Sequence, residues 1–251
     1  MKDWIASMGD LTPVLERTWP ASRTYRNGPF VVTDPDAGGS RVSAARLASS
    51  ENEEAPAGDI ESAEAMMMAQ GRAPLFRVLD TQTTLNAALN VRGYITRDTT
   101  IAMVINSAEI AATPPPVTAF EIWPPLAIQN EIWEASGINA ARRAIMDRAE
   151  HCRKTSLFGR IADKPAGAAY IGILHETAML HALEVAPIAR RKGLAAHIMR
   201  TAAAWAADNG ATWLSILVTQ QNVAAQGLYT SLGMKPVGTY HYREKEGGTA
   251  Q

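Results

Sequence analysis

Arg190-Arg191-Lys192-Gly193-Leu194-Ala195 is the stretch of sequence that decides the fold of this chain. An apolar run of strand length, residues 179–185, precedes it, and an alanine-rich helical pattern follows as far as Asp208. The first N–H groups of a helix lack intrahelical partners, and the helix dipole adds partial positive charge there. Gly193 permits a turn whose N–H groups converge on a close ligand. A strand, a basic glycine-containing turn and a helix start together predict a phosphate-binding site.

Two common phosphate-binding motifs are missing from the sequence. There is no G-x-x-x-x-G-K-[ST], the loop that holds ATP or GTP, and no G-x-G-x-x-G after a strand, which disfavours a dinucleotide fold. The remaining pattern, R-x-x-G-x-A, occurs in many surface turns. On its own it leaves a solvated basic helix start as the alternative interpretation.

The segments that follow the turn continue an alternating pattern of helices and strands. Asn209-Gly210 ends the first helix, and residues 212–218 are rich in strand-forming side chains. Asn222 is a good N-cap for a second helix that Gly233 ends. Residues 234–242 then form a last expected strand. The C-terminal order is therefore strand, phosphate turn, helix, strand, helix, strand.

Two motifs in this region recur in one order and spacing in a known family. R-x-x-G-x-A covers Arg190 to Ala195, and N-x-x-A-x-x-L-Y-x-x-L-G-M covers Asn222 to Met234. Over residues 165–242 the chain resembles the GNAT superfamily of acyl-CoA-dependent N-acyltransferases. The resemblance implies an α/β fold with a GNAT-like mixed central sheet flanked by helices.

The resemblance also implies where acetyl-CoA, the acyl donor, would bind. The basic turn would hold the pyrophosphate, the backbone of the preceding strand would pair with the pantetheine arm, and Asn222 would touch the cofactor. No metal is expected. The predicted cofactor-binding residues are Leu183, Val185, Arg190, Arg191, Lys192, Gly193, Leu194, Ala195 and Asn222.

Direct attack of an amine on a thioester requires an acid and a base. Tyr229 occupies the motif position of the acid that protonates the leaving thiolate; the alternative is a helix residue that only packs. Glu184 and His181 are base candidates, and their odd separation predicts opposite faces of one strand. A water chain to solvent is an equally good base. The predicted catalytic residues are Tyr229 and Glu184.

Composition narrows the class of protein. The chain has 251 residues, 24 basic and 25 acidic side chains, and this balance argues against nucleic-acid and membrane-surface partners. The length allows one or two domains. Cys152 is the single cysteine, which excludes an intrachain disulfide and suits a reducing compartment. The first residues lack the apolar core of a signal peptide. We expect a cytoplasmic protein; the sequence leaves an oligomer open.

The N-terminal half shows a similar order of elements. Strands are expected over 29–33, 41–47, 75–79 and 99–105, helices over 59–70 and 81–92, and a proline-rich linker over 111–117. Aligning Gly93 with Gly233 gives an offset of 140 residues, which brings Tyr229 onto Leu89 and Asn222 onto Gln82.

The same offset carries the phosphate turn onto residues 50–55, where Glu51, Glu53 and Glu54 would repel a pyrophosphate. We therefore predict two tandem units: a degenerate GNAT-like unit over 1–112 and an acyl-CoA-binding acetyltransferase domain over 113–251. The alternative is that helix–glycine–strand is a generic α/β pattern.

An aromatic segment, residues 120–133, lies between the halves, and a helix is expected over 139–150. Trp123 and Trp133 either line an amine pocket or pack the two halves together. The predicted function is transfer of an acetyl group from acetyl-CoA to a primary amine. Balanced charge fits a small-molecule acceptor and a peptide equally. The alternatives are a non-catalytic acyl-CoA-binding or regulatory module and a structural or interaction protein.

Overall fold

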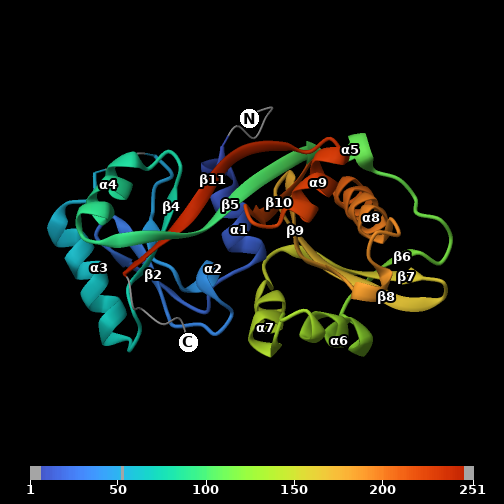
Figure 1. Cartoon of the computed structure of the whole chain (residues 1–251), viewed down its shortest axis with the longest axis horizontal. Coiled ribbons are helices and arrows are strands. Elements are labelled where there is room, and N and C mark those ends of the chain that lie inside the picture. Colours follow the sequence, from blue (N-terminus) through green and yellow to red (C-terminus); the bar gives the residue numbers. More distant parts are fainter. Residues whose placement is uncertain (1–6, 52–53, 246–251) are drawn as a thin grey trace.

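The computed structural model describes residues 7–51 and 54–245 and contains two sheets (Figure 1). In spatial order, the large mixed sheet consists of β4 (Leu75–Leu79), β11 (Lys235–Lys245), β5 (Tyr94–Asn106), β10 (Trp213–Thr219), β9 (Thr177–Val185), β8 (Lys164–Leu174), β7 (Arg153–Ile161) and β6 (Ala119–Ile122). The small antiparallel sheet consists of β1 (Thr24–Asn27), β2 (Phe30–Thr33) and β3 (Arg46–Leu47).

The helices cover both faces of the large sheet. They are α1 (Met8–Thr18), α2 (Ser40–Ser43), α3 (Ala57–Ala69), α4 (Thr83–Val91), α5 (Ser107–Ile110), α6 (Ala127–Ala135), α7 (Ala140–Arg148), α8 (Leu194–Asp208) and α9 (Val223–Ser231), with a 3-10 turn over Pro187–Ala189. In Figure 1, α8 lies on one side of the β6–β9 strands, and α6 and α7 lie on the other. The predicted α/β class, with a mixed sheet flanked by helices, is confirmed.

The C-terminal elements lie where the sequence predicted them. Helix α8 spans the predicted residues, because glycines in the left-handed conformation stand at both of its ends, Gly193 with φ +83° and Gly210 with φ +85°. The strands on either side of it, β9 and β10, run parallel over part of their length. A parallel pair joined by a helix is the βαβ arrangement that the pattern of alternating elements favours.

Strand β5 joins the two halves of the chain into one sheet. It comes from the N-terminal half but lies between β10 and β11, antiparallel to both. Its pairing with β10 runs from Asn106↔Trp213 to Thr100↔Thr219. Figure 1 shows the long β5 and β11 side by side across the middle of the molecule. Each half therefore completes the sheet of the other.

The strand order is symmetric about the β5–β11 pair. Exchanging β4 with β10 and β5 with β11 gives β10-β5-β11-β4, which is the order β4-β11-β5-β10 read from its other end. Helix α4 begins and ends 140 residues before α9, as the sequence offset predicted. Leu89 and Tyr229 are buried at equivalent positions of these helices. A parallel bridge from Ala45 to Phe76 on β4 corresponds to the parallel β9–β10 pair. The fold therefore contains two similar units in tandem.

Three apolar clusters stabilise the fold. The first packs α8 on one face of the C-terminal strands, and the second packs α1, α6 and α7 on the other face. The third fills the N-terminal half around Phe30, Phe76 and Tyr94. Because α1 belongs to the second cluster, the N-terminus of the chain covers strands of the C-terminal half. In the described parts of the chain, no helix combines the length and apolar character needed to cross a bilayer.

The predicted strand over 41–47 is wrong in its first half. Residues 40–43 form the single turn of α2, and only Arg46–Leu47 pairs as a strand. The hydroxyl of Ser43 donates to the carbonyl oxygens of Asp36 and Gly39, at 2.9 and 3.1 Å, which holds the turn closed. Side chain-to-backbone bonds of this kind compete with sheet pairing. The sequence also did not predict α1, β1, β6, β7 and β8.

A truncated chain that begins at Pro116 is expected to lose its cooperative fold. It lacks β5, so β10 keeps an unpaired edge and β11 loses both of its neighbours. It also lacks α1, which uncovers the apolar face of β8 and β9. Size-exclusion chromatography and thermal unfolding should show an aggregated or non-cooperative protein, in contrast to the full chain. A soluble truncation with one sharp transition would contradict this.

Candidate active site

Strands β9 and β10 separate in the middle of the sheet. Their parallel pairing runs from Thr177↔Trp213 to Leu180↔Ile216 and then stops. Beyond that point β10 stays paired with β5, and β9 stays paired with β8 as far as Val185. The two strands therefore diverge toward the start of α8. The diverging edges carry backbone polar groups that a bound chain can pair with.

A β-bulge shapes the diverging part of β9. The register against β8 shifts between Ala168 and Tyr170, and Ala182 in the bulge has φ +53°. The indole Nε1–H of Trp133 donates to the carbonyl oxygen of Ala182 at 2.8 Å. Trp133 is fully buried on α6. Its side chain thus anchors α6 to the bulge, whereas the sequence left it between an amine pocket and a packing role.

The backbone N–H groups of Leu183 and Val185 point into the space between the diverging strands β9 and β10. The N–H of Ala186 bonds to Ala166 on β8 at 2.8 Å. Successive residues of a strand direct their N–H groups to opposite edges, so Val185 and Leu183 face the β10 side. The guanidinium Nε–H of Arg190 donates to the carbonyl oxygen of Val185 at 3.0 Å. This bond ties the basic turn to the end of β9.

The predicted phosphate turn has an open helix start at its centre. Arg190, Arg191 and Lys192 are exposed, and no described side chain caps the first turn of α8 at Gly193. A Cβ built at Gly193 would meet only His197 Nε2, at 4.0 Å, so a ligand can approach the backbone. Leu194 is buried in the first cluster and holds the helix start in place.

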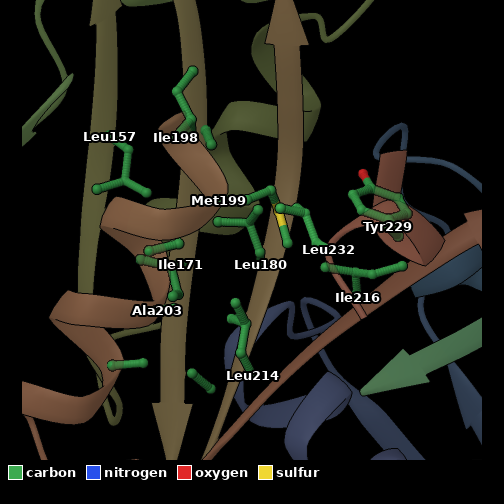
Figure 2. Close-up of a cluster of buried hydrophobic side chains, with 14 of the residues drawn as sticks. Leu157, Ile171, Leu180, Ile198, Met199, Ala203, Leu214, Ile216, Tyr229 and Leu232 are labelled. Atoms are coloured by element: carbon green, nitrogen blue, oxygen red, sulfur yellow. The ribbon is translucent and has the colours of Figure 1, made fainter. Parts of the chain in front are cut away.

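Tyr229 lies at the side of this site on α9. Figure 2 shows its ring beside Ile216 and Leu232, at the edge of the cluster that α8 covers. Burial, and secondarily the carboxylate of Glu184, raise the pKa of Tyr229 to about 12. The phenol therefore keeps its proton near neutral pH, as an acid must. The exposed Asn222 caps α9: its Oδ1 accepts from the N–H of Ala225 at 3.1 Å.

Glu184 is half-buried on β9, close enough to Tyr229 to affect its pKa. Burial raises the pKa of Glu184, while a hydrogen bond from Ser136 and the charge of Arg190 oppose that rise. Ser136 follows α6, and nothing in the sequence pointed to it, because only the fold brings it to β9. The structure thus brings Tyr229, Glu184 and Arg190 of the predicted set together.

The predicted opposite orientation of His181 and Glu184 is wrong. On neighbouring strands, His181 lies opposite Tyr170 and Glu184 lies opposite Ala168. Residues opposite each other share a face, and Tyr170 and Ala168 are two residues apart. His181 and Glu184 therefore share a face. The bulge adds one residue between them, and a count of residues in a regular strand does not include it.

His181 is part of the core. It is 4% exposed and stacks on Trp19, with 5.0 Å between ring centroids. Its Nε2 lies 2.8 Å from the hydroxyl oxygen of Thr18, which itself donates to Val14, so Nε2 carries the hydrogen. Burial, followed by the charge of Arg41, lowers the pKa of His181 well below its usual range. A neutral, enclosed imidazole stabilises the packing of α1 on β9.

Comparison with known proteins finds similarity over part of the chain. Residues 120–234 match the acetyltransferase (GNAT) family, the family that the sequence resembles. The chain is 30% identical over 103 residues to YobR of Bacillus subtilis, named an uncharacterized N-acetyltransferase. That match covers 40% of this chain and 40% of the length of YobR.

Solved structures extend the similarity of fold to the N-terminal half. A GCN5-related N-acetyltransferase from Kribbella flavida matches with a TM-score of 0.72 and 20% identity, covering 94% of this chain and 93% of its own. A tandem GNAT protein from the clavulanic acid biosynthesis pathway matches with a TM-score of 0.63 and 11% identity, covering 96% and 89%. At such identities the likeness concerns the fold alone.

Proposed function

We propose that the chain is an acyl-CoA-dependent N-acetyltransferase whose acyl donor binds between β9 and β10. The observation that carries this is the divergence of the two strands directly beside the open start of α8. The diverging edge supplies backbone partners for an extended arm, and the helix start with Arg190 to Lys192 supplies partners for its phosphates. The match of residues 120–234 to the GNAT family supports the same assignment.

The proposed reaction is direct transfer of an acetyl group to a primary amine of a small molecule or a peptide. The amine nitrogen bonds to the thioester carbonyl carbon, and the N–H of Val185 stabilises the developing oxyanion. The carbon–sulfur bond then breaks, and Tyr229 donates its proton to the leaving thiolate. Glu184 accepts the proton that the amine loses. Glu184 then releases its proton to solvent, and solvent returns a proton to Tyr229, whose raised pKa favours the neutral phenol.

We assign donor binding to the C-terminal unit, over 113–251, and treat residues 1–112 as the degenerate unit. At the place that corresponds to the phosphate turn, the N-terminal unit carries exposed Glu51 and Glu54; Glu53 lies outside the described residues. Like charges there oppose a pyrophosphate. Trp123 is half-buried, with Lys154 Nζ 4.7 Å from its ring centre, and we keep it as a candidate for the amine pocket.

The function is tested by mixing the full chain with acetyl-CoA and a panel of amines and peptides, and detecting the released thiol. Amine-dependent thiol release with acetylated product by mass spectrometry supports the proposal. Calorimetric binding of acetyl-CoA without turnover on any amine would favour a non-catalytic binding module. A chain that binds no acetyl-CoA would leave a structural or interaction role.

Glu184→Gln is expected to lower kcat/KM by about 10²- to 10⁴-fold and to remove an acidic limb from the pH profile. Burial raises the pKa of Glu184, so in the wild type this limb should lie above the ordinary glutamate range. Acetyl-CoA affinity should change little. An unaltered kcat/KM and profile would instead favour a water chain as the base.

The same substitution makes a prediction for stability. Because folding raises the pKa of Glu184, its ionised carboxylate destabilises the folded state. This destabilisation is absent below the pKa of the unfolded state and grows as the pH rises through the pKa of the folded state. The melting temperature of Glu184→Gln should therefore gain on the wild type between about pH 4.5 and neutral pH. A melting temperature of Glu184→Gln below that of the wild type over this pH range would show that folding lowers the pKa of Glu184.

A further inference from the structure

A polar cavity separate from the proposed acyl-CoA site lies where the two units meet. Its volume is about 470 Å³. Its lining comes from α1, the segment that joins α1 to β1, β1, β2, α2, β3 and β4 of the N-terminal half, and from α7, the segment after it and the end of β8 of the C-terminal half. It contains no residue of the predicted acyl-CoA site. Six arginines line it: Arg17, Arg23, Arg41, Arg46, Arg77 and Arg148.

These arginines are only partly neutralised. Glu16 is the single carboxylate residue of the lining, and it pairs with both Arg46 and Arg77. Arg148 pairs with Asp36, with Nη2 and Oδ2 2.7 Å apart. The other three, Arg17, Arg23 and Arg41, have no carboxylate partner among the residues that the structure describes. The cavity therefore carries an excess of positive charge.

Two polar atoms of the lining are buried without a partner. The hydroxyl oxygen of Thr33, a residue only 8% exposed, has no hydrogen-bond partner within the described ranges. Nor has the Nε of Arg148. Buried donors are almost always paired in native proteins, because an unpaired one loses its hydration without replacement. A ligand with acceptor oxygens would supply the missing partners.

The positive charge of the cavity arginines shifts the pKa of neighbouring side chains. Burial would raise the pKa of Tyr240, but the charge of Arg41, the hydrogen bonds of Tyr242 and Thr100, and the charge of Arg77 together lower it. Arg41 also adds to the lowering of the pKa of His181 that burial causes. The guanidinium of Arg41 thus lies near the buried side chains of Tyr240 and His181, where its field is weakly screened.

We propose that this cavity binds a small molecule with two or more anionic groups, carboxylates or phosphates. The volume suits a metabolite and not a macromolecular segment. Arginine forks hold carboxylate and phosphate oxygens in pairs, which gives orientation as well as affinity. Leu15, Trp19 and Pro20 provide apolar wall for a carbon skeleton. A ligand here contacts both units and stabilises their junction.

The experiment titrates the full chain with citrate and with inorganic pyrophosphate at constant ionic strength, by calorimetry and thermal unfolding. Acetate and chloride serve as monoanionic controls. Because pyrophosphate can also occupy the start of α8, the titration is repeated with Gly193→Glu. We expect binding at one site that survives in this variant and raises the melting temperature. The stronger of the two anions identifies a polycarboxylate or a phosphate ligand.

Two variants connect the binding to the cavity. Arg17→Gln/Arg23→Gln removes two exposed charges and should weaken binding at least about tenfold. Thr33→Val keeps the shape, removes a hydroxyl without a described partner, and should weaken binding several-fold with no loss of stability. The matched control Arg153→Gln/Arg160→Gln removes the same charge away from the cavity and should bind as the wild type does.

Three results would overturn the proposal. The first is the lack of any heat or stabilisation by either polyanion at millimolar concentration. The second is equal loss of affinity in the cavity variant and its charge-matched control, which would indicate a diffuse electrostatic effect. The third is loss of all polyanion binding in Gly193→Glu, which would place the anion at the start of α8. None of these depends on acetyltransferase activity.

Discussion

Tyr229→Phe is expected to lower kcat by about 10²- to 10⁴-fold while acetyl-CoA affinity changes little. The substitution removes only the hydroxyl and keeps the ring in the apolar cluster beside Leu232. In the wild type the pKa of about 12 leaves the phenol protonated at neutral pH, ready to donate to the thiolate. Without that donor, the thiolate must leave as an anion in a partly buried site, which raises the barrier.

The measurement is kcat at saturating amine and acetyl-CoA, with calorimetry for cofactor affinity and thermal unfolding for the fold. Tyr25→Phe, which removes an exposed hydroxyl bonded to Asp34, is the matched control and should keep full activity. An unchanged kcat in Tyr229→Phe would leave this residue with a packing role alone. A fall in kcat that is accompanied by a large drop in the melting temperature would also indicate a packing role for Tyr229.

Gly193→Glu is expected to reduce acetyl-CoA affinity on the order of 100-fold or more, since it removes at least two charge-assisted contacts. The new side chain places a carboxylate where the pyrophosphate must approach the start of α8, beside Arg190 to Lys192. The space around Gly193 is open, so no steric clash unfolds the chain. A side chain at φ +83° does cost about 1–2 kcal/mol of folding free energy.

Gly210→Glu provides the matched control for that strain. It places the same side chain at φ +85° after the C-terminal end of α8, also with open space around it. Both variants should lose similar stability, but only Gly193→Glu should lose acetyl-CoA binding. Equal binding in the two variants would show that the phosphate contacts lie elsewhere.

The local C-terminal elements were predictable because their signals are local. Glycines at both ends of α8 and the Asn222 cap of α9 set element limits through the conformation of a few neighbouring residues. The family resemblance rests on the same short motifs. Local signals likewise predicted a helix over 81–92, and the 140-residue offset between Gly93 and Gly233 matches the spacing of α4 and α9. For α2 the local signal misled, because hydroxyl bonds of Ser43 form a turn within a strand-like pattern.

The sequence by itself thus determined the elements from β9 to β11, the family resemblance and the basic turn at Arg190. Only the tertiary structure decided how distant segments meet. The bulge at Ala182, held by Trp133, placed Glu184 on the face of His181, and β5 entered the sheet between β10 and β11. The tertiary structure also brings six arginines from both halves of the chain to one cavity. The physical reason is that strand register, bulges and cavities depend on contacts between residues far apart in the chain, and no local pattern encodes such contacts.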